Sequence, residues 1–243
     1  MTQQFLHTTP SELIQDVVSR QVEIKSSARR VHRTFTLSMP MAIDPLLDHP
    51  STAAAFEADE YLPYWADLWP ASQMLGEAIL SALSLPQRVL EIGCGLGLSG
   101  LAALSQGCHV TFSDYDDSAL AFAARNAQQN GFTHFETQQM DWRHPPDGMQ
   151  FPLILAADVM YEARHTTPVA QLIAHCLTDN GECWLVDPNR PYAAEFRAAL
   201  SSAHLIFEVT ETSTMTVDHR TAHGTLYKIS RSSSIKSPTP DNK

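Results

Sequence analysis

The sequence predicts an α/β fold built on a doubly wound, mostly parallel sheet. From residue 88 onward short apolar runs alternate with helical patterns, the connections are short, and a glycine-rich turn follows the first run. Strands that alternate with helices pair in parallel, because each helix carries the chain back to the same end of the sheet. Seven strand-like runs are present, so we expect a seven-stranded, Rossmann-like sheet.

Residues 1–60 are expected to form an extension of helix, strands and loop. The motif TPSE, from Thr9 to Glu12, is typical of a helix start, with a threonine cap, a proline in the first turn and a glutamate three residues after the cap. Apolar residues at helical spacing follow it. We therefore expect a short amphipathic helix that reaches Val17 and Val18.

Alternating residues dominate the rest of the extension. Residues 31–37 alternate as a strand does, and residues 21–25 are a candidate pairing partner. Residues 38–63 are interrupted by prolines and are predicted to be a loop. Residues 70–83 have the apolar spacing of a helix.

The main domain is expected to cover residues 61–230. Its predicted strands span 88–92, 108–113, 133–139, 151–157, 181–186, 204–212 and 217–229. Its predicted helices span 97–106, 117–130, 162–177 and 191–202. No helical pattern separates the last two strands, which favours an antiparallel hairpin. Residues 231–243 are polar with two prolines, which is typical of a disordered tail.

Charge is distributed unevenly along the chain. Residues 20–33 carry five Lys and Arg against one Glu, whereas residues 34–219 carry six Arg and no Lys against 23 Asp and Glu. An acidic body repels a phosphate backbone, which argues against nucleic acid as a partner and favours cationic partners. The alternative is that the acidic surface only keeps the protein soluble.

No run of about 18 apolar residues is present, so we expect no membrane-spanning helix and no membrane partner. The first residues lack the basic start and apolar core of a signal peptide, which favours a cytoplasmic location. Cys94, Cys108, Cys176 and Cys183 form no C-x-x-C pair and are expected to be reduced and buried. The histidines are scattered, and we expect no metal site.

The stretch RVLEIGCGLGLSG has a glycine-rich loop that fits two nucleotide patterns. The dinucleotide pattern G-x-G-x-x-G is met by Gly95, Gly97 and Gly100. A second pattern, E-x-G-x-G-x-G for S-adenosylmethionine, is met by Glu91, Gly93, Gly95 and Gly97. A carboxylate beside the loop is badly placed for a pyrophosphate but suits an ammonium and a sulfonium, and the helix start at Gly97 suits the methionine carboxylate. We therefore predict S-adenosylmethionine; the alternative is that Glu91 is a charge at the sheet edge.

Residues at the next two strand ends complete the predicted nucleotide site. Asp114 ends the second strand, where an acidic side chain hydrogen-bonds ribose hydroxyls. After the third strand, Asp141 is expected to accept a hydrogen bond from the adenine amino group, and Trp142 to line the adenine pocket. Tyr115 is placed to cover the other side of the adenine. The alternative for each aromatic residue is a packing role only.

Several segments together resemble a known family. VLEIGCGLG, SDYD, DW and ILAADVMYE are similar to the seven-β-strand (class I) S-adenosylmethionine-dependent protein-lysine methyltransferases. The mark of that group is an acidic-x-x-aromatic motif after the fourth strand, here Asp158 to Tyr161. PYWADLWPAS resembles the segment that closes over the cofactor in those enzymes. LVDPNRPYAAEF resembles a segment of the lysine methyltransferases that act on the electron transfer flavoprotein β subunit, and the likeness covers residues 61–211.

The resemblance implies roles for individual residues. It implies cofactor contacts for Trp69, Gly93, Cys94, Gly95, Asp114, Trp142 and Ala157. It implies that Asp158 and Tyr161 face the nucleophile as catalytic residues. It implies that Tyr64, Trp65, Asn189 and Arg190 lie near the substrate mouth. The alternatives are that Asp158 caps the following helix and that Arg190 pairs with a surface carboxylate.

The function implied is methyl transfer from S-adenosylmethionine to a lysine of a protein, with electron transfer flavoprotein β as a candidate acceptor. A free lysine has a pKa near 10.4, so its deprotonation at pH 7 costs about 4.6 kcal/mol. An apolar channel beside a cationic donor lowers that pKa, whereas Asp158 alone raises it, so we assign Asp158 to positioning the amine. The alternatives are a small-molecule N-methyltransferase acting on a nicotinamide-like or other amine, and a binding module without turnover. The intact Asp158 and Tyr161 argue against the binding module.

Overall fold

The computed structural model describes residues 16–26, 28–216 and 218–232 of the chain. Its strands are β1 (Val17–Ser26), β2 (Val31–Pro40), β3 (Arg88–Ile92), β4 (His109–Asp114), β5 (Phe135–Gln139), β6 (Phe151–Ala157), β7 (Leu177–Asp187), β8 (Leu205–Met215) and β9 (Thr221–Arg231). Its helices are α1 (Asp44–Leu47), α2 (Pro50–Asp59), α3 (Pro70–Ser81), α4 (Leu98–Leu104), α5 (Asp117–Gln129), α6 (Thr166–Cys176) and α7 (Ala193–Ser202). Short 3₁₀ helices lie at Tyr64–Ala66 and Ala163–His165.

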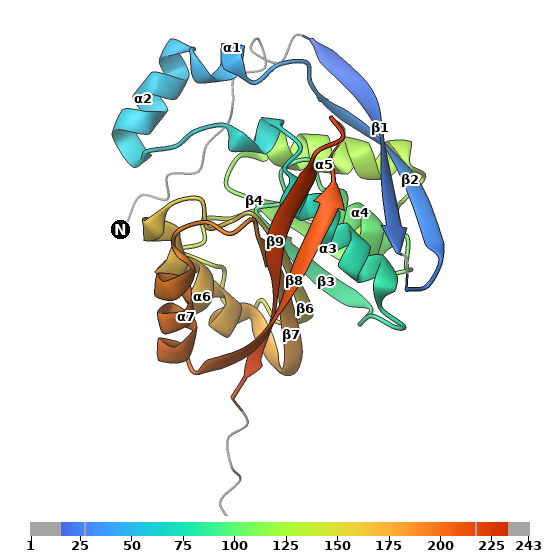
Figure 1. The fold of residues 1–243 in the computed structure, drawn as a ribbon. Helices are drawn as coiled ribbons and strands as arrows, with labels where there is room; N and C mark the ends of the chain where they lie inside the picture. Colours follow the sequence, from blue (N-terminus) through green and yellow to red (C-terminus); the bar gives the residue numbers. More distant parts are fainter. Residues whose placement is uncertain (1–15, 27, 217, 233–243) are drawn as a thin grey trace, which may run out of the picture.

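A seven-stranded sheet lies at the centre, with the strand order β5-β4-β3-β6-β7-β9-β8 (Figure 1). Strands β3 to β7 pair in parallel, and β9 runs antiparallel to both β7 and β8. The predicted α/β fold with a mostly parallel seven-stranded sheet is confirmed, and so is its closing hairpin.

Helices cover both faces of this sheet (Figure 1). On one face α3, α4 and α5 pack against side chains such as Val89, Phe112 and Leu155. On the other face α6 and α7 pack against side chains such as Leu90 and Ile154. Both faces are apolar because the inner parallel strands are buried on two sides, whereas the edge strand β5 is largely exposed. No helix in the described ranges is long and apolar enough to cross a membrane.

The order in which strands are added to the sheet reverses at β3. From β3 the chain winds outward through β4 to β5, and it then returns to place β6 on the other side of β3. The loops that leave the carboxyl ends of β3 and β6 therefore diverge to opposite faces of the sheet. Such a switch point opens a crevice in which doubly wound proteins bind ligands.

The extension begins with a two-stranded ribbon that packs on the main domain through α3 and α5. Strands β1 and β2 pair antiparallel, which confirms the predicted pairing. The fully buried amide of Asn126 accepts the Ser38 N–H at 2.7 Å and donates to the carbonyls of Ser38 and Leu96, at 3.1 and 2.9 Å. One side chain therefore holds both β2 and the glycine-rich turn.

Val17 and Val18, predicted to be helical, belong to β1. There they pair with residues of β2, and their β-branched side chains suit an extended ribbon better than a helix. The preceding part of that predicted helix, from Thr9, lies outside the described residues. So does the predicted tail except for its first two residues, of which Arg231 ends β9.

The prediction of a loop over residues 38–63 was wrong, because that segment contains α1 and α2. Pro45 and Pro50 stand in the first turns of these helices, where the missing N–H would have no partner in any case. His49 caps α2 by accepting the Ser51 N–H at 3.2 Å. The prolines therefore marked helix starts.

Gly100 permits close packing of α4 on the sheet, and its replacement should destabilise the protein. A Cβ there would overlap the Phe112 ring and lie 2.5 Å from the Glu91 carboxylate. We expect Gly100→Ala to lower the free energy of unfolding by about 1–3 kcal/mol in urea denaturation. Gly76→Ala in α3 is the matched control, because the one atom that its Cβ would overlap is the terminal methyl of Ile24, which can rotate away. Equal losses in the two variants would contradict this account.

Candidate active site

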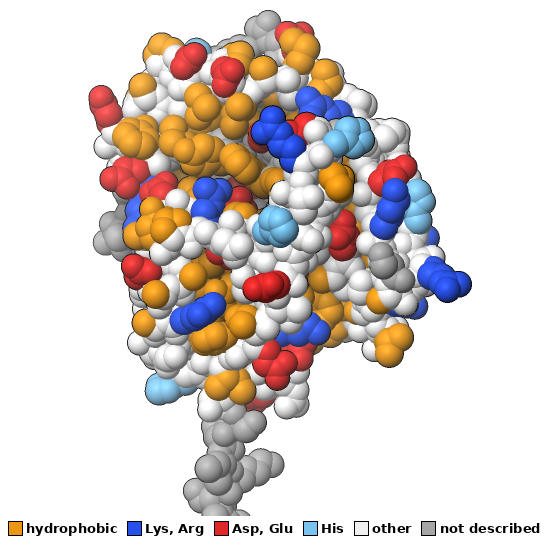
Figure 2. All heavy atoms as spheres, in the orientation of Figure 1, with side chains coloured by type: hydrophobic (Ala, Val, Ile, Leu, Met, Phe, Trp, Pro, Cys, Tyr) orange, Lys and Arg blue, Asp and Glu red, His pale blue; other side chains and the backbone are white. Residues whose placement is uncertain are grey.

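A cavity of about 410 Å³ lies at the carboxyl ends of β3 to β6. Its walls come from the glycine-rich turn after β3 and from the residues that follow β4, β5 and β6. Residues 59–69, called the lid below, close it from the other side. Apolar side chains gather on this side of the molecule over α2 and the chain after it, beside a hollow (Figure 2).

The turn after β3 has a backbone that favours glycine. Gly93, Gly95 and Gly97 have φ angles of +58°, +49° and +80°. A Cβ on Gly93 would also lie 2.9 Å from the Trp142 ring. Gly97 directly precedes α4, so the helix N-terminus faces the cavity wall. The glycines therefore allow a tight turn and leave space in the cavity that larger side chains would fill.

Glu91 lies in the centre of the sheet and is only 3% exposed. Its Oε2 accepts the Gly100 N–H at 3.0 Å. Burial raises the pKa of this carboxyl to about 8, against the opposing effect of hydrogen bonds from Gly100 and Ser99. Glu91 is therefore not a charge at the sheet edge, and the alternative assigned to it is wrong.

Asp114 holds the glycine-rich turn from the end of β4. One carboxylate oxygen accepts the Gly95 N–H at 2.9 Å, and the other accepts the Asp116 N–H at 3.1 Å. Burial raises the pKa of Asp114 to about 6, although these two N–H groups favour its charged form. The carboxylate lines the cavity, where it still has lone pairs for a ligand.

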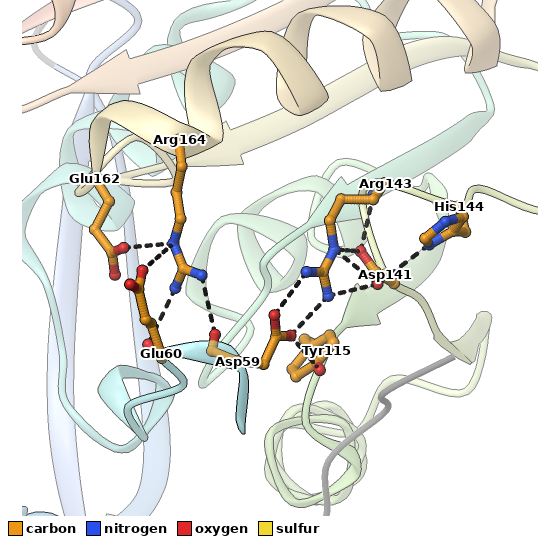
Figure 3. A network of polar contacts seen from close by, with 8 residues as sticks. All are labelled: Asp59, Glu60, Tyr115, Asp141, Arg143, His144, Glu162 and Arg164. Carbon is orange, nitrogen blue, oxygen red and sulfur yellow. Dashed lines mark hydrogen bonds and ion pairs between the residues drawn. The ribbon is translucent and has the colours of Figure 1, made fainter. Parts of the chain in front are cut away.

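Arg143 joins the lid to the far wall of the cavity (Figure 3). Its guanidinium donates two hydrogen bonds of 2.7 Å to Asp59, at the end of α2, and lies 2.8–2.9 Å from both oxygens of Asp141. The Tyr115 hydroxyl also donates to Asp59, at 2.8 Å. These bonds to Arg143 hold the pKa of Asp59 below its usual value. Asp141, the predicted adenine acceptor, is therefore already bound to Arg143.

Arg164 makes a second connection to the same lid. It donates to the backbone carbonyls of Asp59 and Glu60, at 3.0 and 3.1 Å, and pairs with the carboxylates of Glu60 and Glu162 (Figure 3). Two arginines from the loops after β5 and β6 thus fix the end of α2 over the cavity.

Trp65 anchors the lid from inside. Its Nε1–H donates to Asp116 at 3.1 Å, and its ring packs 5.4 Å from that of Phe122. Tyr61 donates to the same carboxylate. Trp65 lines the cavity, as predicted for a residue near the substrate mouth, but it is only 7% exposed. Its hydrogen bond and ring packing give it a structural role as well.

Asp158 and Arg190 form a bidentate ion pair in the cavity wall. The Nε and the second guanidinium nitrogen of Arg190 each lie 3.0 Å from one oxygen of Asp158. Asp158 has φ of +55° and is 8% exposed. It caps no helix, since the next helical turn begins at Ala163 after Glu162. The alternative that Asp158 caps a helix is therefore wrong. The alternative that Arg190 pairs with a surface carboxylate is also wrong, because its partner is buried.

Aromatic rings line the same cavity as this ion pair. Tyr161 lies with its ring centroid 5.3 Å from that of Tyr64 and 4.5 Å from that of His165. The ring centroid of Trp142 lies 5.5 Å from that of His165. The Nε1 of Trp142 and the Nδ1 of His165 are buried without a hydrogen-bond partner among the described residues. Two unpaired polar atoms in a cavity wall favour a polar ligand there.

Sequence reasoning missed His165. Burial lowers its pKa to about 4, so the ring is neutral near pH 7. No periodic pattern pointed to it, because Tyr161 precedes the helical turn that begins at Ala163, and the two rings meet only in the folded chain.

The cavity brings together all but one of the predicted site residues. Its lining includes Tyr64, Trp65, Trp69, Glu91, Gly93, Cys94, Gly95, Gly97, Asp114, Tyr115, Asp141, Trp142, Ala157, Asp158, Tyr161 and Arg190. Asn189 is absent from the lining, and its side chain instead accepts a hydrogen bond from Thr225 at 2.9 Å. In the described part of the chain, no group of three or more His, Cys, Asp or Glu is placed to hold a metal ion.

Comparison with known proteins identifies the family of the chain. A family model described as lysine methyltransferase matches residues 64–198, more than half of the chain. The electron transfer flavoprotein beta subunit lysine methyltransferase of Danio rerio is 32% identical over 134 residues, which are 53% of this chain and 51% of that protein. The histidine protein methyltransferase 1 homolog of Dictyostelium discoideum is 32% identical over 105 residues, or 41% and 34% of the two chains. The chain thus spans about a third to a half of the length of these curated relatives.

Solved structures share the fold. A TehB-like SAM-dependent methyltransferase from Corynebacterium glutamicum superposes with a TM-score of 0.52 at 16% identity, covering 75% of this chain and 95% of that one. A ribosomal protein L11 methylase from Lactobacillus delbrueckii subsp. bulgaricus gives a TM-score of 0.51 at 21% identity, covering 66% and 78%. At these identities the likeness concerns the fold alone.

The raised pKa of Glu91 should make stability depend on pH. The folded protein keeps this proton up to about pH 8, whereas the unfolded chain loses it near pH 4.5, so the unfolded state binds fewer protons in between. The free energy of unfolding should therefore fall as pH rises through that window. Relative to Glu91→Gln, we expect a decline of up to about 1.4 kcal/mol per pH unit in urea denaturation. The exposed Glu57→Gln serves as control, and parallel curves for wild type and Glu91→Gln would contradict the assignment.

Proposed function

The chain belongs to the lysine methyltransferase family, and we propose that it transfers a methyl group from S-adenosylmethionine to a lysine side chain of a protein. The observation that carries this proposal is the placement of Asp158 and Tyr161 in one cavity with the glycine-rich turn. A cofactor held at the turn and an amine held beside Asp158 would meet inside that cavity.

Three features of the cavity fit this cofactor. A volume of about 410 Å³ lies within the usual range for small-ligand sites. The unpaired Nε1–H of Trp142 can donate a hydrogen bond to a polar ligand, and the unpaired Nδ1 of His165 can form a second one. The buried carboxyls of Glu91 and Asp114 suit an ammonium and a ribose. The residues that would hold the cofactor are Trp69, Glu91, Gly93, Cys94, Gly95, Gly97, Asp114, Tyr115, Asp141, Trp142 and Ala157.

When bound, S-adenosylmethionine supplies a methyl group on a positively charged sulfur. Such a group is already activated, so the proposed reaction needs no metal and depends mainly on orientation, which is worth up to about 7–11 kcal/mol. The rings of Tyr64 and Tyr161 pack edge to face in the cavity wall and would form one side of an aromatic channel for the stem of the lysine. Asp158 positions the amine at the inner end of that channel.

The acceptor is proposed to be a protein lysine, with the electron transfer flavoprotein β subunit as the first candidate. The relative from Danio rerio carries that activity in its name, and the acidic body of this chain would attract a lysine-bearing segment. The same charge disfavours nucleic acid, and a cytoplasmic location remains our expectation. A small amine is the second candidate, because the turn and cavity alone do not specify the acceptor's size.

The cofactor assignment predicts a loss of affinity on removal of Asp114. We expect wild type to bind S-adenosylmethionine and its demethylated product at micromolar levels in calorimetry, with no measurable binding of NAD. Asp114→Ala should bind both at least about tenfold more weakly, since a hydrogen bond to a charged group contributes about 1.5–3 kcal/mol. Asp147→Ala, an exposed acid after β5, should leave the affinity unchanged. Tight binding of NAD by wild type would exclude this cofactor.

The acceptor assignment predicts methyl label on a lysine. Purified protein, labelled donor and the electron transfer flavoprotein β subunit should yield label that peptide mass analysis places on a lysine side chain. The rate at low acceptor concentration should fall as salt rises, because screening weakens the attraction to the acidic body. Label on small amines such as nicotinamide, with every protein fraction blank, would support the second candidate instead.

A further inference from the structure

Arg190 is held in one position beside Asp158 by the turn that carries it. Its backbone N–H donates to Asp187 at 2.9 Å, and Asp187 is 2% exposed at the end of β7. Asn189 precedes it with φ of +61°, which bends the chain back toward the cavity. The guanidinium then reaches both oxygens of Asp158 at 3.0 Å. Its fork is thus set for a carboxylate before any ligand enters.

This pair changes what an incoming amine meets. A lone buried carboxylate attracts an ammonium ion and favours the protonated form of an amine beside it. The side chain of Asp158 is 5% exposed, so little water screens its charge, but the guanidinium balances that charge at contact distance. The pair still offers the outer lone pairs of the carboxylate as hydrogen-bond acceptors.

We propose, building on the function proposed above, that Arg190 is a positioning residue that cancels the charge of Asp158, so that the cavity receives the acceptor amine in its neutral form. The neutral nitrogen uses its lone pair to form the new N–C bond while the bond from that carbon to sulfur breaks. Sulfur leaves as a neutral thioether, and the charged product amine gives one proton to water. An ammonium has no lone pair and cannot begin this step.

Other titratable groups face the same region and are common to every variant compared below. They are Asp187 on β7, Tyr64 in the lid, Tyr161, Glu162 and Arg164 after β6, and Asp114 after β4. A difference between Arg190 variants therefore reports the charge of Arg190 itself.

The test compares wild type, Arg190→Gln and Arg190→Lys in methyl transfer to the electron transfer flavoprotein β subunit between pH 6 and 10. In Arg190→Gln the unbalanced carboxylate should keep the bound amine protonated, which lowers kcat about 10–100-fold at pH 7. The rising limb of the kcat profile should move about one to two pH units upward, so that the rates converge near pH 10. KM should stay equal or fall, and Arg190→Lys should restore most of the wild-type profile.

Arg197→Gln is the matched control, because it removes the same charge from an exposed residue of α7 that does not line the cavity. Its pH profile should match wild type. A loss in Arg190→Gln by the same factor at every pH would indicate a merely structural role and overturn the proposal. An equal shift in Arg197→Gln would overturn it as well.

A second readout does not depend on the acceptor. With the demethylated cofactor product present, n-butylamine stands in for the lysine side chain, and its binding at pH 7 is measured by calorimetry. Arg190→Gln should bind this cation at least about tenfold more tightly than wild type and Arg197→Gln do. If Arg190→Gln binds more tightly but no variant transfers a methyl group to any amine, the proposed function is wrong and the charge-cancelling role of Arg190 still holds. Equal binding, or no binding, by all the variants would overturn the role of Arg190.

Discussion

Gly93, Gly95 and Gly97, which alternate with other residues in the turn after β3, all have positive φ angles. The rest of the site is arranged around that backbone. The turn is fixed from β4, where the Ser113 carbonyl accepts the Cys94 N–H at 3.0 Å and Asp114 accepts the Gly95 N–H. A residue with a Cβ would strain the turn at each of these glycines. The cavity and the buried Asp114 therefore depend on the same few backbone angles.

Each acidic side chain in the cavity wall is compensated in its own way. Arg143 balances Asp59 and Asp141, and Arg190 balances Asp158. Two backbone N–H groups hold Asp114. Glu91 has only N–H and hydroxyl partners, so it is compensated largely by keeping its proton. Asp114 is the carboxylate in this wall that is held by N–H groups and not by an arginine, so it is the one that a cationic ligand would meet near the glycine-rich turn, away from the place proposed for the acceptor amine.

The sequence was sufficient for the sheet and for most of the cavity lining, because both follow from local signals. The carboxyl ends of parallel strands meet at one edge of a sheet. Recognising the strands was therefore enough to predict that Asp114, Asp141 and Asp158 lie near one another. The ion pairs that hold the lid were missed because their partners are remote: Asp59 and Arg143 are 84 residues apart. No local pattern specifies such a pair. The ion pair of Asp158 with Arg190 was likewise hidden, since the turn at Asn189 aims Arg190 inward only in the folded chain.

The buried amide of Asn126 also has a consequence for how the protein is made. Ser38 leaves the ribosome 88 residues before the side chain that will hold it, which at usual synthesis rates is a delay of about 4–18 s. During that interval α5 is not yet present to cover the apolar side of β2, and only α3, which packs on β1, has been made. The basic residues of 20–33 then matter most, because like charge on nascent chains of one polysome keeps their open strand edges from pairing with each other.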